Sequence, residues 1–181
     1  VALGVGASIP HFRRTTLQKE YIYLILISGI PGVLLGVYTA STLPSDLSTS
    51  LLGFLTLFLS FFSINNKQLG NSKLIISITR FRIFIGSLGL FIIGFLNGYL
   101  SSGTGLFVTI WMITIFNLSF SVAIAYTLIL VGIFWNGIGA ISLGLSGNII
   151  WGFIPILILG SLVGGYFGAY FSIIKGSKFI K

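Results

Sequence analysis

The chain has 181 residues, of which 55% are hydrophobic and only 7% are charged, and its formal net charge is +8. A soluble domain has roughly 25% charged residues, so this composition excludes a soluble globular core. Apolar runs of about 20 residues, long enough to cross the hydrocarbon of a bilayer, recur along the whole sequence. They predict an all-α fold, a polytopic transmembrane helical bundle whose main surroundings are the lipid bilayer.

The predicted spans follow one another with short polar turns between them. The chain begins at Val1, within an apolar glycine-rich stretch, and we interpret it as a fragment that has lost an N-terminal portion. A turn at residues 44–46 includes Asp46, which suits the cap of the next helix. The apolar runs lie at residues 21–43, 51–64, 83–100, 106–116, 122–143 and 149–174.

Basic residues gather in three clusters between or after these runs. The clusters are Arg13, Arg14 and Lys19, then Lys67, Lys73, Arg80 and Arg82, and finally Lys175, Lys178 and Lys181. Lysine and arginine accumulate in the cytoplasmic loops of membrane proteins. We therefore expect cytoplasmic basic loops and a cytoplasmic C-terminus at the inner (plasma) membrane. The same pattern explains the net charge without a nucleic-acid partner.

Charge parity constrains the middle of the chain. Residues 122–143 and 149–174 form an uncharged hairpin, so the C-terminal lysines lie on the side where that hairpin begins. For all three basic clusters to be cytoplasmic, residues 83–116 must cross the membrane an even number of times. One continuous helix fails this condition. A broken pair of helices, or a re-entrant hairpin, satisfies it.

A small-polar break interrupts the region that parity requires to turn. It consists of Ser101, Ser102, Gly103, Thr104 and Gly105, and no charged residue occurs between Arg82 and Lys175. Loose backbone inside a bilayer is tolerated only where it is buried in protein or lines a cavity. A helix that starts at the break would direct free N–H groups and its positive dipole end at an anion, with the hydroxyls as further donors. The alternative is a kink or close packing without a ligand.

Three polar residues outside the break complete the candidate binding site. Asn97 precedes the break by about one helical turn and either faces the same cavity or bonds carbonyls freed by the break. Thr127 and Asn136 lie within the 122–143 run, where polar side chains face either other helices or a pathway. Asn136, beside Gly137, is the better pathway candidate of the two.

Spaced glycines indicate helix-packing faces and a weak internal repeat. The candidate packing residues are Gly32, Gly36, Gly160, Gly164 and Gly168. Residues 4–7 match residues 137–140. The pair Gly32 and Gly36 matches the pair Gly164 and Gly168, and the sequence offsets of the two matches differ by one residue. Parity makes the two copies inverted, as in many secondary transporters. The alternative is chance similarity, because membrane helices are rich in glycine.

Missing residue types narrow the chemistry further. Glu20 and Asp46 are the only acids, and both lie at segment ends, so no intramembrane carboxylate relays protons or binds a cation. No catalytic set or metal-binding cluster stands out, so we expect no enzyme, no cofactor and no metal. His11 lies beside the first basic cluster, where we expect it to be solvated.

These residues resemble the sulfite exporter TauE/SafE family of bacterial membrane permeases. The resemblance rests on residues 94–98 and 102–105 at a broken helix, 122–127 on the next helix, 147–151 at a turn and 160–168 on the last helix. It implies a permease for a sulfur oxyanion or organosulfonate such as sulfite. Ser101, Ser102 and Thr104 dilute the family's glycine run, and Thr109 lies near the position of its usual proline.

The resemblance also implies a division of the chain. Residues 1–64 would be the remnant of a first repeat with about two complete spans, 65–82 a cytoplasmic basic loop, and 83–181 a second repeat with its broken helix near 101–105. The first repeat's own broken helix is missing, so if the pathway needs both breaks this fragment alone is not a complete transporter. The alternatives are a non-transporting structural membrane subunit and an inactive fragment, and a homo-oligomer is left open.

Overall fold

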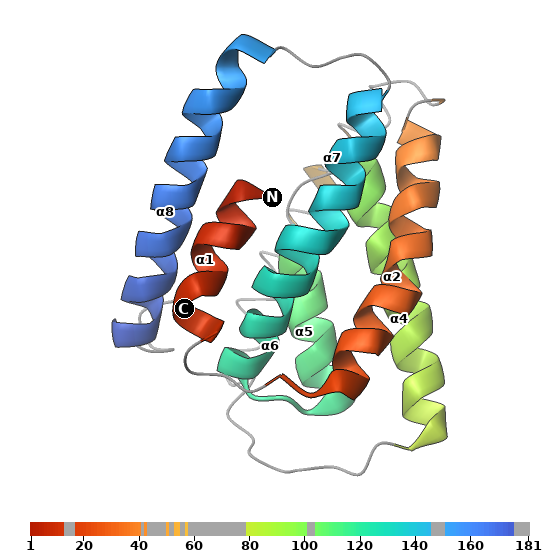
Figure 1. Ribbon diagram of the computed structural model, residues 1–181. Coiled ribbons are helices and arrows are strands. Elements are labelled where there is room, and N and C mark those ends of the chain that lie inside the picture. The colour runs from red at the N-terminus through yellow and green to blue at the C-terminus, as the bar shows by residue number, and fades with distance from the viewer. Residues whose placement is uncertain are drawn as a thin grey trace.

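The computed structural model describes residues 1–12, 17–40, 42, 50, 53–54, 57, 79–100, 104–145 and 151–175. Most residues in these ranges are helical and none forms a strand, which confirms the all-α prediction (Figure 1). The helices are α1 (Ala2–Phe12), α2 (Lys19–Ala40), α4 (Arg80–Leu100), α5 (Thr104–Phe116), α6 (Phe120–Tyr126), η1 (Thr127–Trp135), α7 (Asn136–Leu145), η2 (Trp151–Phe153) and α8 (Ile154–Lys175). The predicted span at 51–64 and Ser101, Ser102 and Gly103 of the break lie outside the described residues.

Four helices in the described ranges are long and apolar enough to cross a membrane. They are Lys19–Ala40, Arg80–Leu100, Phe120–Leu145 and Trp151–Phe171. The third combines α6, η1 and α7 into one continuous helix of 26 residues. At 1.5 Å per residue, the 13 residues of α5 cover about 20 Å, less than the roughly 30 Å of hydrocarbon. The polytopic class is therefore confirmed, with α5 as a shorter apolar helix inside the bundle.

Helix α4 begins earlier than the sequence predicts. Its first turn contains Arg80 and Arg82, whereas the apolar run begins only at residue 83. Long basic side chains extend their polar heads to the interface while their stems stay on the helix, so charge does not end a helix there. After α5, at the same end of the bundle as Arg82, Asn117 adopts φ 53°, a left-handed conformation that asparagine tolerates, and the chain leaves α5 for α6.

Helices α4 and α5 form an antiparallel hairpin. The Trp111 indole N–H donates to the Gly86 carbonyl at 3.2 Å, and an Arg82 guanidinium N–H reaches the Ile115 carbonyl at 3.5 Å. Nearer the break, the Thr104 hydroxyl donates to the Asn97 side-chain oxygen. Later residues of α5 therefore contact earlier residues of α4, so α5 returns the chain to the end of the bundle where α4 began. This is the geometry that charge parity requires.

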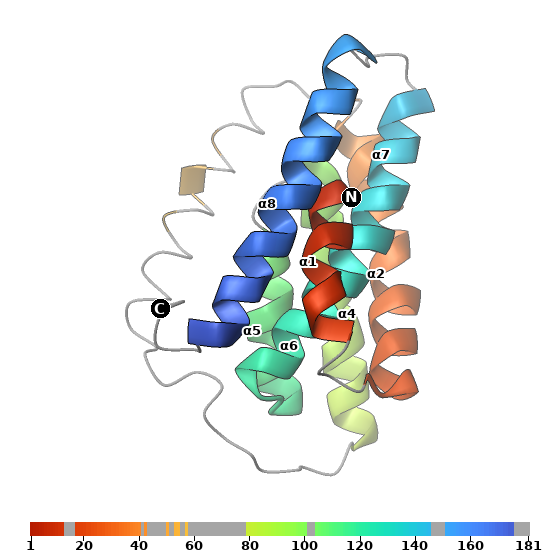
Figure 2. The same cartoon turned by 60° about the vertical axis from the view of Figure 1, so that its left-hand side comes forward.

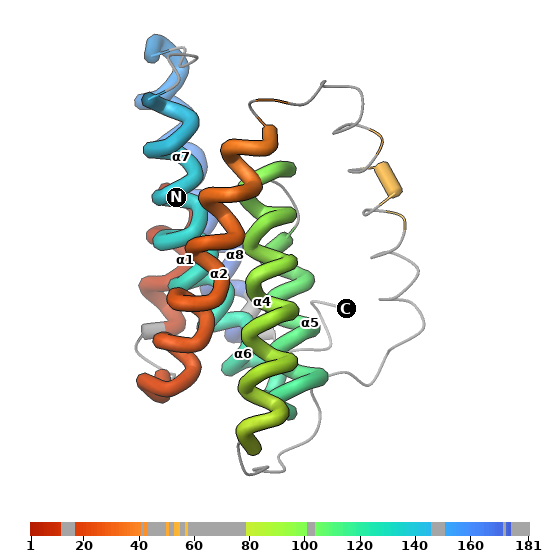
Figure 3. Tube along the Cα trace, turned by 90° about the vertical axis from the view of Figure 1, so that its right-hand side faces the viewer, coloured from red at the N-terminus to blue at the C-terminus, as the bar shows by residue number. Residues whose placement is uncertain are grey.

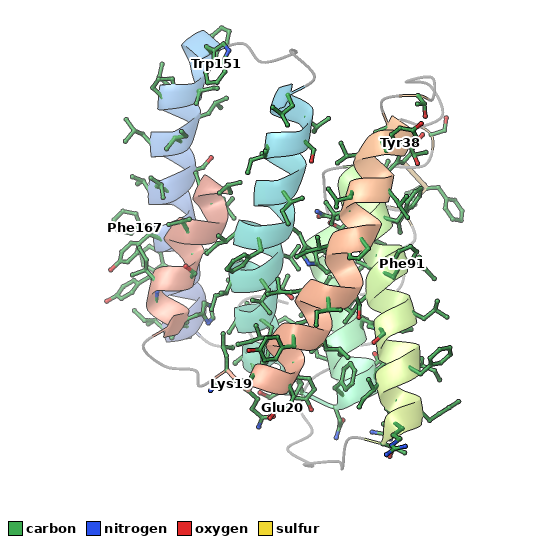
Figure 4. All side chains as sticks on the ribbon, turned by 45° about the vertical axis from the view of Figure 1, so that its right-hand side comes forward. Lys19, Glu20, Tyr38, Phe91, Trp151 and Phe167 are labelled. Carbon is green, nitrogen blue, oxygen red and sulfur yellow. The ribbon has the colours of Figure 1, made fainter. Side chains whose placement is uncertain are left out.

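The helix directions bring the described basic ends together. Helices α2, α4 and α6–α7 run one way, and α5 and α8 run back (Figures 1 and 2). Lys19 lies at the end where α4 begins and α8 finishes, whereas Tyr38 and Trp151 lie at the opposite end (Figure 4). In the predicted repeat, α1 corresponds to α7 and α2 corresponds to α8. The two helices of each pair run in opposite directions (Figure 1). The inverted repeat itself stays a prediction.

Glycines allow α2 and α4 to pack backbone against backbone (Figure 3). A Cβ on Gly32 would overlap the Phe91 carbonyl, and one on Gly36 would overlap the Phe95 carbonyl. From the other side, Gly94 meets the Gly29 carbonyl and Gly98 meets the Val33 carbonyl. Close backbone approach through small residues is the usual way membrane helices associate. The first predicted pair of packing glycines lies in this interface.

Helix α1 packs against α8 and η1, again through glycine, but not through the predicted residues of α8. Gly165 of α8 lies against α1, with the Leu3 carbonyl 2.6 Å from the place a Cβ would occupy. At the three predicted packing positions, no atom of the described chain lies within 4 Å of a Cβ. These positions are Gly160, Gly164 and Gly168. Sequence spacing therefore did not identify the face of α8 that contacts α1.

His11 is buried, contrary to the expectation that it is solvated. His11 lies near the end of α1 and is 5% exposed, and its Nε2 atom has no hydrogen-bond partner in the described structure. The reason is packing: the last turn of α1 lies within the bundle rather than in the basic loop that follows it. Burial lowers the pKa of His11 below its ordinary value, because the charged imidazolium is poorly solvated there.

Candidate functional site

Five neutral polar side chains from three parts of the chain form two hydrogen-bonded groups, one of three residues and one of two. They are Asn97 on α4, Thr104 and Thr109 on α5, Thr127 at the start of η1 and Asn136 at the start of α7. We call these five residues the Asn/Thr cluster. Four of them are buried, and Asn136 is half-buried. Buried polar groups in an apolar bundle require partners, so their convergence is the clearest chemical feature of the interior.

The first part of the cluster is a directional chain of hydrogen bonds. The Thr104 hydroxyl donates to Asn97 Oδ1, and Asn97 Nδ2 donates to Asn136 Oδ1 at 3.2 Å. This uses both ends of the Asn97 amide and leaves the Asn136 amide N–H groups at the end of the chain. Within the described structure, Asn136 enters this chain through its Oδ1 atom, and its Nδ2 group carries two further donors.

The second part of the cluster is a pair of threonines. Thr109 Oγ1 and Thr127 Oγ1 lie 2.9 Å apart. Each hydroxyl also lies 3.0 Å from a carbonyl one turn back, that of Gly105 for Thr109 and that of Ala123 for Thr127. Gly105 faces the same pair, because a Cβ there would be 3.2 Å from the Thr127 methyl. The pair has two hydroxyl protons for three possible hydrogen bonds, so a hydroxyl can rotate and donate to a different acceptor within the cluster.

Local structure places these residues in two ways. The described part of α5 begins at Thr104, and the first N–H groups of a helix have no partners within that helix. On the opposite side, the nine residues of η1 form a π-helix that begins at Thr127 and ends just before Asn136. π-Helical segments are rare and are frequently found at functional sites. The widened turn lies between the two cluster residues of this helix.

The cluster provides hydrogen-bond donors but contains no charged side chain. Its members are hydroxyls and carboxamides, and the N-terminus of α5 adds main-chain donors and a positive dipole end. In the described part of the chain, no three His, Cys, Asp or Glu side chains are grouped so as to hold a metal ion. The arrangement is suited to holding a small solute by hydrogen bonds.

Comparison with known proteins identifies the family. The profile described as "Sulfite exporter TauE/SafE" matches residues 1–181, the whole chain. The chain belongs to the sulfite exporter TauE/SafE family. A similar curated protein is the "Probable membrane transporter protein ORF9" of Sinorhizobium sp, 28% identical over 178 residues. That alignment covers 97% of this TauE/SafE chain but 66% of the relative, so the chain spans about two thirds of the relative's length. No solved structure matches it significantly.

The structure brings together most of the site that the sequence predicted for this TauE/SafE protein. Asn97, Thr104, Gly105, Thr127 and Asn136 lie in or against one cluster. The other three predicted residues lie outside the described part of the chain. They are Ser101, Ser102 and Gly103. Whether any of the eight binds a substrate stays a prediction.

Thr109 is the residue that sequence reasoning missed as a site member. It was noted only as the residue near a proline position of the TauE/SafE family. The available signal was its spacing, because Thr109 follows Gly105 by four residues and therefore lies one turn further along the same helix face. Its partner, Thr127, is 18 residues away in sequence, and only the α5–η1 contact shows the pairing.

A separate hollow of about 290 Å³ lies away from the cluster, at the basic end of the TauE/SafE chain. Its walls are mostly apolar and come from the first turns of α2 and α4 and from the end of α5. Lining residues include Glu20, Tyr21, Ser28, Ser87 and Phe116. None of the cluster residues lines it. Buried hydroxyls and amides are a more specific feature than an open apolar hollow, so the cluster is the better candidate site.

Proposed function

We propose that this protein is a permease for a small anion, and that the Asn/Thr cluster is part of the binding site. The substrate class is a sulfur oxyanion or an organosulfonate, with sulfite as the first candidate. The observation that carries the proposal is the convergence of buried neutral donors at the start of α5, inside a chain of the sulfite exporter TauE/SafE family.

Neutral donors suit an anion that must be released again. Hydrogen bonds to a charged ligand are stronger than neutral ones, yet the five residues of the cluster include no cation that would hold the ligand permanently. Main-chain N–H groups at a helix start bind sulfate and phosphate groups in the same manner. The Asn136 amide, whose Nδ2 donors are not used in the described chain of side-chain hydrogen bonds, would join them.

Movement would follow the architecture of the proposed repeats. Residues 1–64 and 83–181 would rock against each other around a site near the membrane centre, with the loop 65–82 in the cytoplasm. The α4–α5 hairpin supports this scheme, because it returns to the end of the bundle from which it started. Coupling to an ion, if present, would use carbonyls and hydroxyls in the described region.

Sulfite flux in membrane vesicles tests the site. In the full-length protein, Thr104→Val removes a cluster hydroxyl while keeping the side-chain shape, and Thr104→Ser keeps the hydroxyl. We expect Thr104→Val to reduce flux about tenfold, since it removes the donor that holds the Asn97 amide in place and a buried group left without its partner costs about 1–3 kcal/mol. Thr104→Ser should retain most of the flux.

Thr114→Val is the matched control. Thr114 lies on the same helix, but it is exposed, and its hydroxyl donates to the Ile110 carbonyl at 2.8 Å. Flux in this variant should equal that of the unmodified protein, measured at equal amounts of folded protein in the vesicles. Equal flux in Thr104→Val and Thr114→Val would contradict the site assignment.

A structural membrane subunit is the second candidate, and one observation favours it. Most hydrogen-bonding groups of the cluster are already satisfied by each other, as expected of residues that only hold helices together. Under this alternative, Thr104→Val would lower thermal stability, and vesicles with the unmodified protein would show no flux above empty vesicles. Transport by the unmodified protein would exclude it.

The orientation we propose places the basic ends in the cytoplasm of the inner membrane. The chain contains no cysteine, so single-cysteine labelling has no background. A membrane-impermeant maleimide added to intact cells should label Leu145→Cys, whose residue is 85% exposed at the end opposite Lys19. Lys19→Cys should react only after permeabilisation. Labelling of both positions in intact cells would contradict the orientation.

A further inference from the structure

Trp135 carries a buried hydrogen-bond donor without an acceptor. The residue is 0% exposed, and its Nε1 atom has no hydrogen-bond partner in the described structure. The other tryptophans differ: the Trp111 N–H donates to the Gly86 carbonyl, and Trp151 is largely exposed. Native interiors rarely leave such a donor unpaired, because removing it from water without a replacement partner is costly. An unpaired donor in this position requires an explanation.

The position of Trp135 links it to the Asn/Thr cluster. It is the last residue of η1 and directly precedes Asn136. Its ring occupies the space that a side chain at Gly29 of α2 would take. The Gly29 carbonyl in turn contacts Gly94 of α4, and Asn97 follows one helical turn later. The indole therefore lies about one turn from the Asn97–Asn136 hydrogen bond, displaced toward the end where α4 begins.

We propose that the indole N–H of Trp135 is a further hydrogen-bond donor for the transported anion, adjacent to the cluster on the side of the basic ends. This inference rests on the proposed function. In the described state the Cζ2, Cε2 and Cη2 edge of the ring lies against Gly29 of α2. The proposal includes a movement of α2 relative to η1 that gives the anion access to the N–H.

The chemistry of the indole makes it a determinant of specificity. Hydroxyls and carboxamides both donate and accept, so Thr104 and Asn136 alone could also hold a cation or a neutral solute. The indole N–H only donates. A donor-only group next to the cluster favours a ligand that accepts hydrogen bonds from several directions, as an oxyanion does. It also adds no charge that would trap the anion.

The test compares sulfite transport by three forms of the full-length protein in vesicles. Trp135→Phe removes the N–H and keeps an aromatic ring, and we expect it to raise the KM for sulfite about tenfold. Trp111→Phe is the control, because its N–H bonds a carbonyl within the α4–α5 hairpin. Its KM should stay unchanged, although its thermal stability should fall.

A second replacement separates the N–H from the shape of the ring. Incorporation of benzothienylalanine at position 135 keeps a bicyclic side chain and substitutes sulfur for the N–H, so it also serves if Trp135→Phe does not fold. The raised KM should persist in this form, with a melting temperature equal to or above that of the unmodified protein, since an unpaired buried donor has been removed. A merely structural role would lower the melting temperature and leave the KM unchanged.

The outcomes separate this inference from the proposed function. If the unmodified protein transports sulfite and the benzothienylalanine form has the same KM, the role of Trp135 is overturned while the permease proposal stands. If the unmodified protein gives no sulfite flux, both are overturned. An increase of KM in the forms that lack the N–H, together with an unchanged KM in Trp111→Phe, supports both.

Discussion

Helices α2 and α8 carry glycine at the same four-residue spacing, yet the structure uses the two sets differently. On α2, Gly32 and Gly36 lie directly against backbone atoms of α4. On α8, Gly164 and Gly168, their counterparts in the proposed repeat, meet no atom of the described chain within 4 Å of a Cβ. The candidate spans reflect this: 33% of the α2 window is buried and only 11% of the α8 window.

The difference teaches that a glycine stripe permits close packing but does not determine it. Without side chains, two helix backbones approach until their carbonyls and Cα atoms touch, and the gain is van der Waals contact. That gain exists only where a second helix arrives. In α2 the partner is α4, which brings its own glycines, Gly94 and Gly98, to the same contact.

The largest expected effect compares Gly36→Ala with Gly168→Ala. At Gly36 the new methyl group would overlap the Phe95 carbonyl, so the α2–α4 pair must separate. We expect a loss of about 3 kcal/mol in unfolding free energy. At Gly168 the methyl group meets open space, and the better helix propensity of alanine should add up to about 1 kcal/mol. Unfolding in mixed detergent micelles measures both changes. A loss at Gly168 equal to that at Gly36 would show that another part of the protein covers this face of α8.

The next comparison uses Gly4 and Gly137, which the repeat also pairs. A Cβ on Gly4 would overlap the backbone of Gly132 in η1, whereas nothing in the described chain lies within 4 Å of one on Gly137. We expect Gly4→Ala to cost about 2 kcal/mol, because it forces α1 away from the π-helical segment. Gly137→Ala should be neutral or slightly stabilising. Thermal unfolding in detergent provides the measurement, and equal effects at the two positions would contradict the described contact.

Two neighbouring glycines on α8 provide a comparison with a smaller expected change in unfolding free energy. Gly165 faces α1, with the Leu3 carbonyl 2.6 Å from the Cβ position, and Gly164 faces away. Alanine at position 165 should cost about 1 kcal/mol, since the end of α1 can yield, and alanine at position 164 should cost nothing. The same unfolding assay ranks them. A reversed order would place α1 on the other face of α8.

His11 provides the smallest expected effect, which depends on pH. Burial lowers the pKa of His11 in the folded state, so the unfolded chain binds the proton more readily. The stability associated with the neutral imidazole is therefore complete above the unfolded pKa of about 6.5 and is lost as pH falls below it. The melting temperature should drop from pH 8 to pH 5.5 by more in the unmodified protein than in His11→Gln. Identical pH dependence in the two forms would show that α1 leaves His11 in contact with water.

Much of the candidate site was predictable from residue types. An apolar sequence that contains Thr104, Thr127, Asn97 and Asn136 identifies these positions as unusual, because isolated polar groups in hydrocarbon are costly. Their pairing was not predictable. Asn97 and Asn136 are 39 residues apart, and the contact depends on how α4 and α7 rotate about their axes. Thr109 was missed for the same reason.

The sequence by itself determined that this protein is an all-α membrane protein with a small-polar stretch before α5 and basic residues in three clusters. These properties follow from local composition, since the bilayer imposes length, hydrophobicity and charge placement on each segment separately. The tertiary structure decided which glycine faces are covered, which threonines hydrogen-bond to each other, and that the Trp135 N–H has no acceptor among the described residues. Each of these depends on two or more helices meeting at a particular rotation, and rotation about a uniformly apolar helix leaves almost no trace in its sequence.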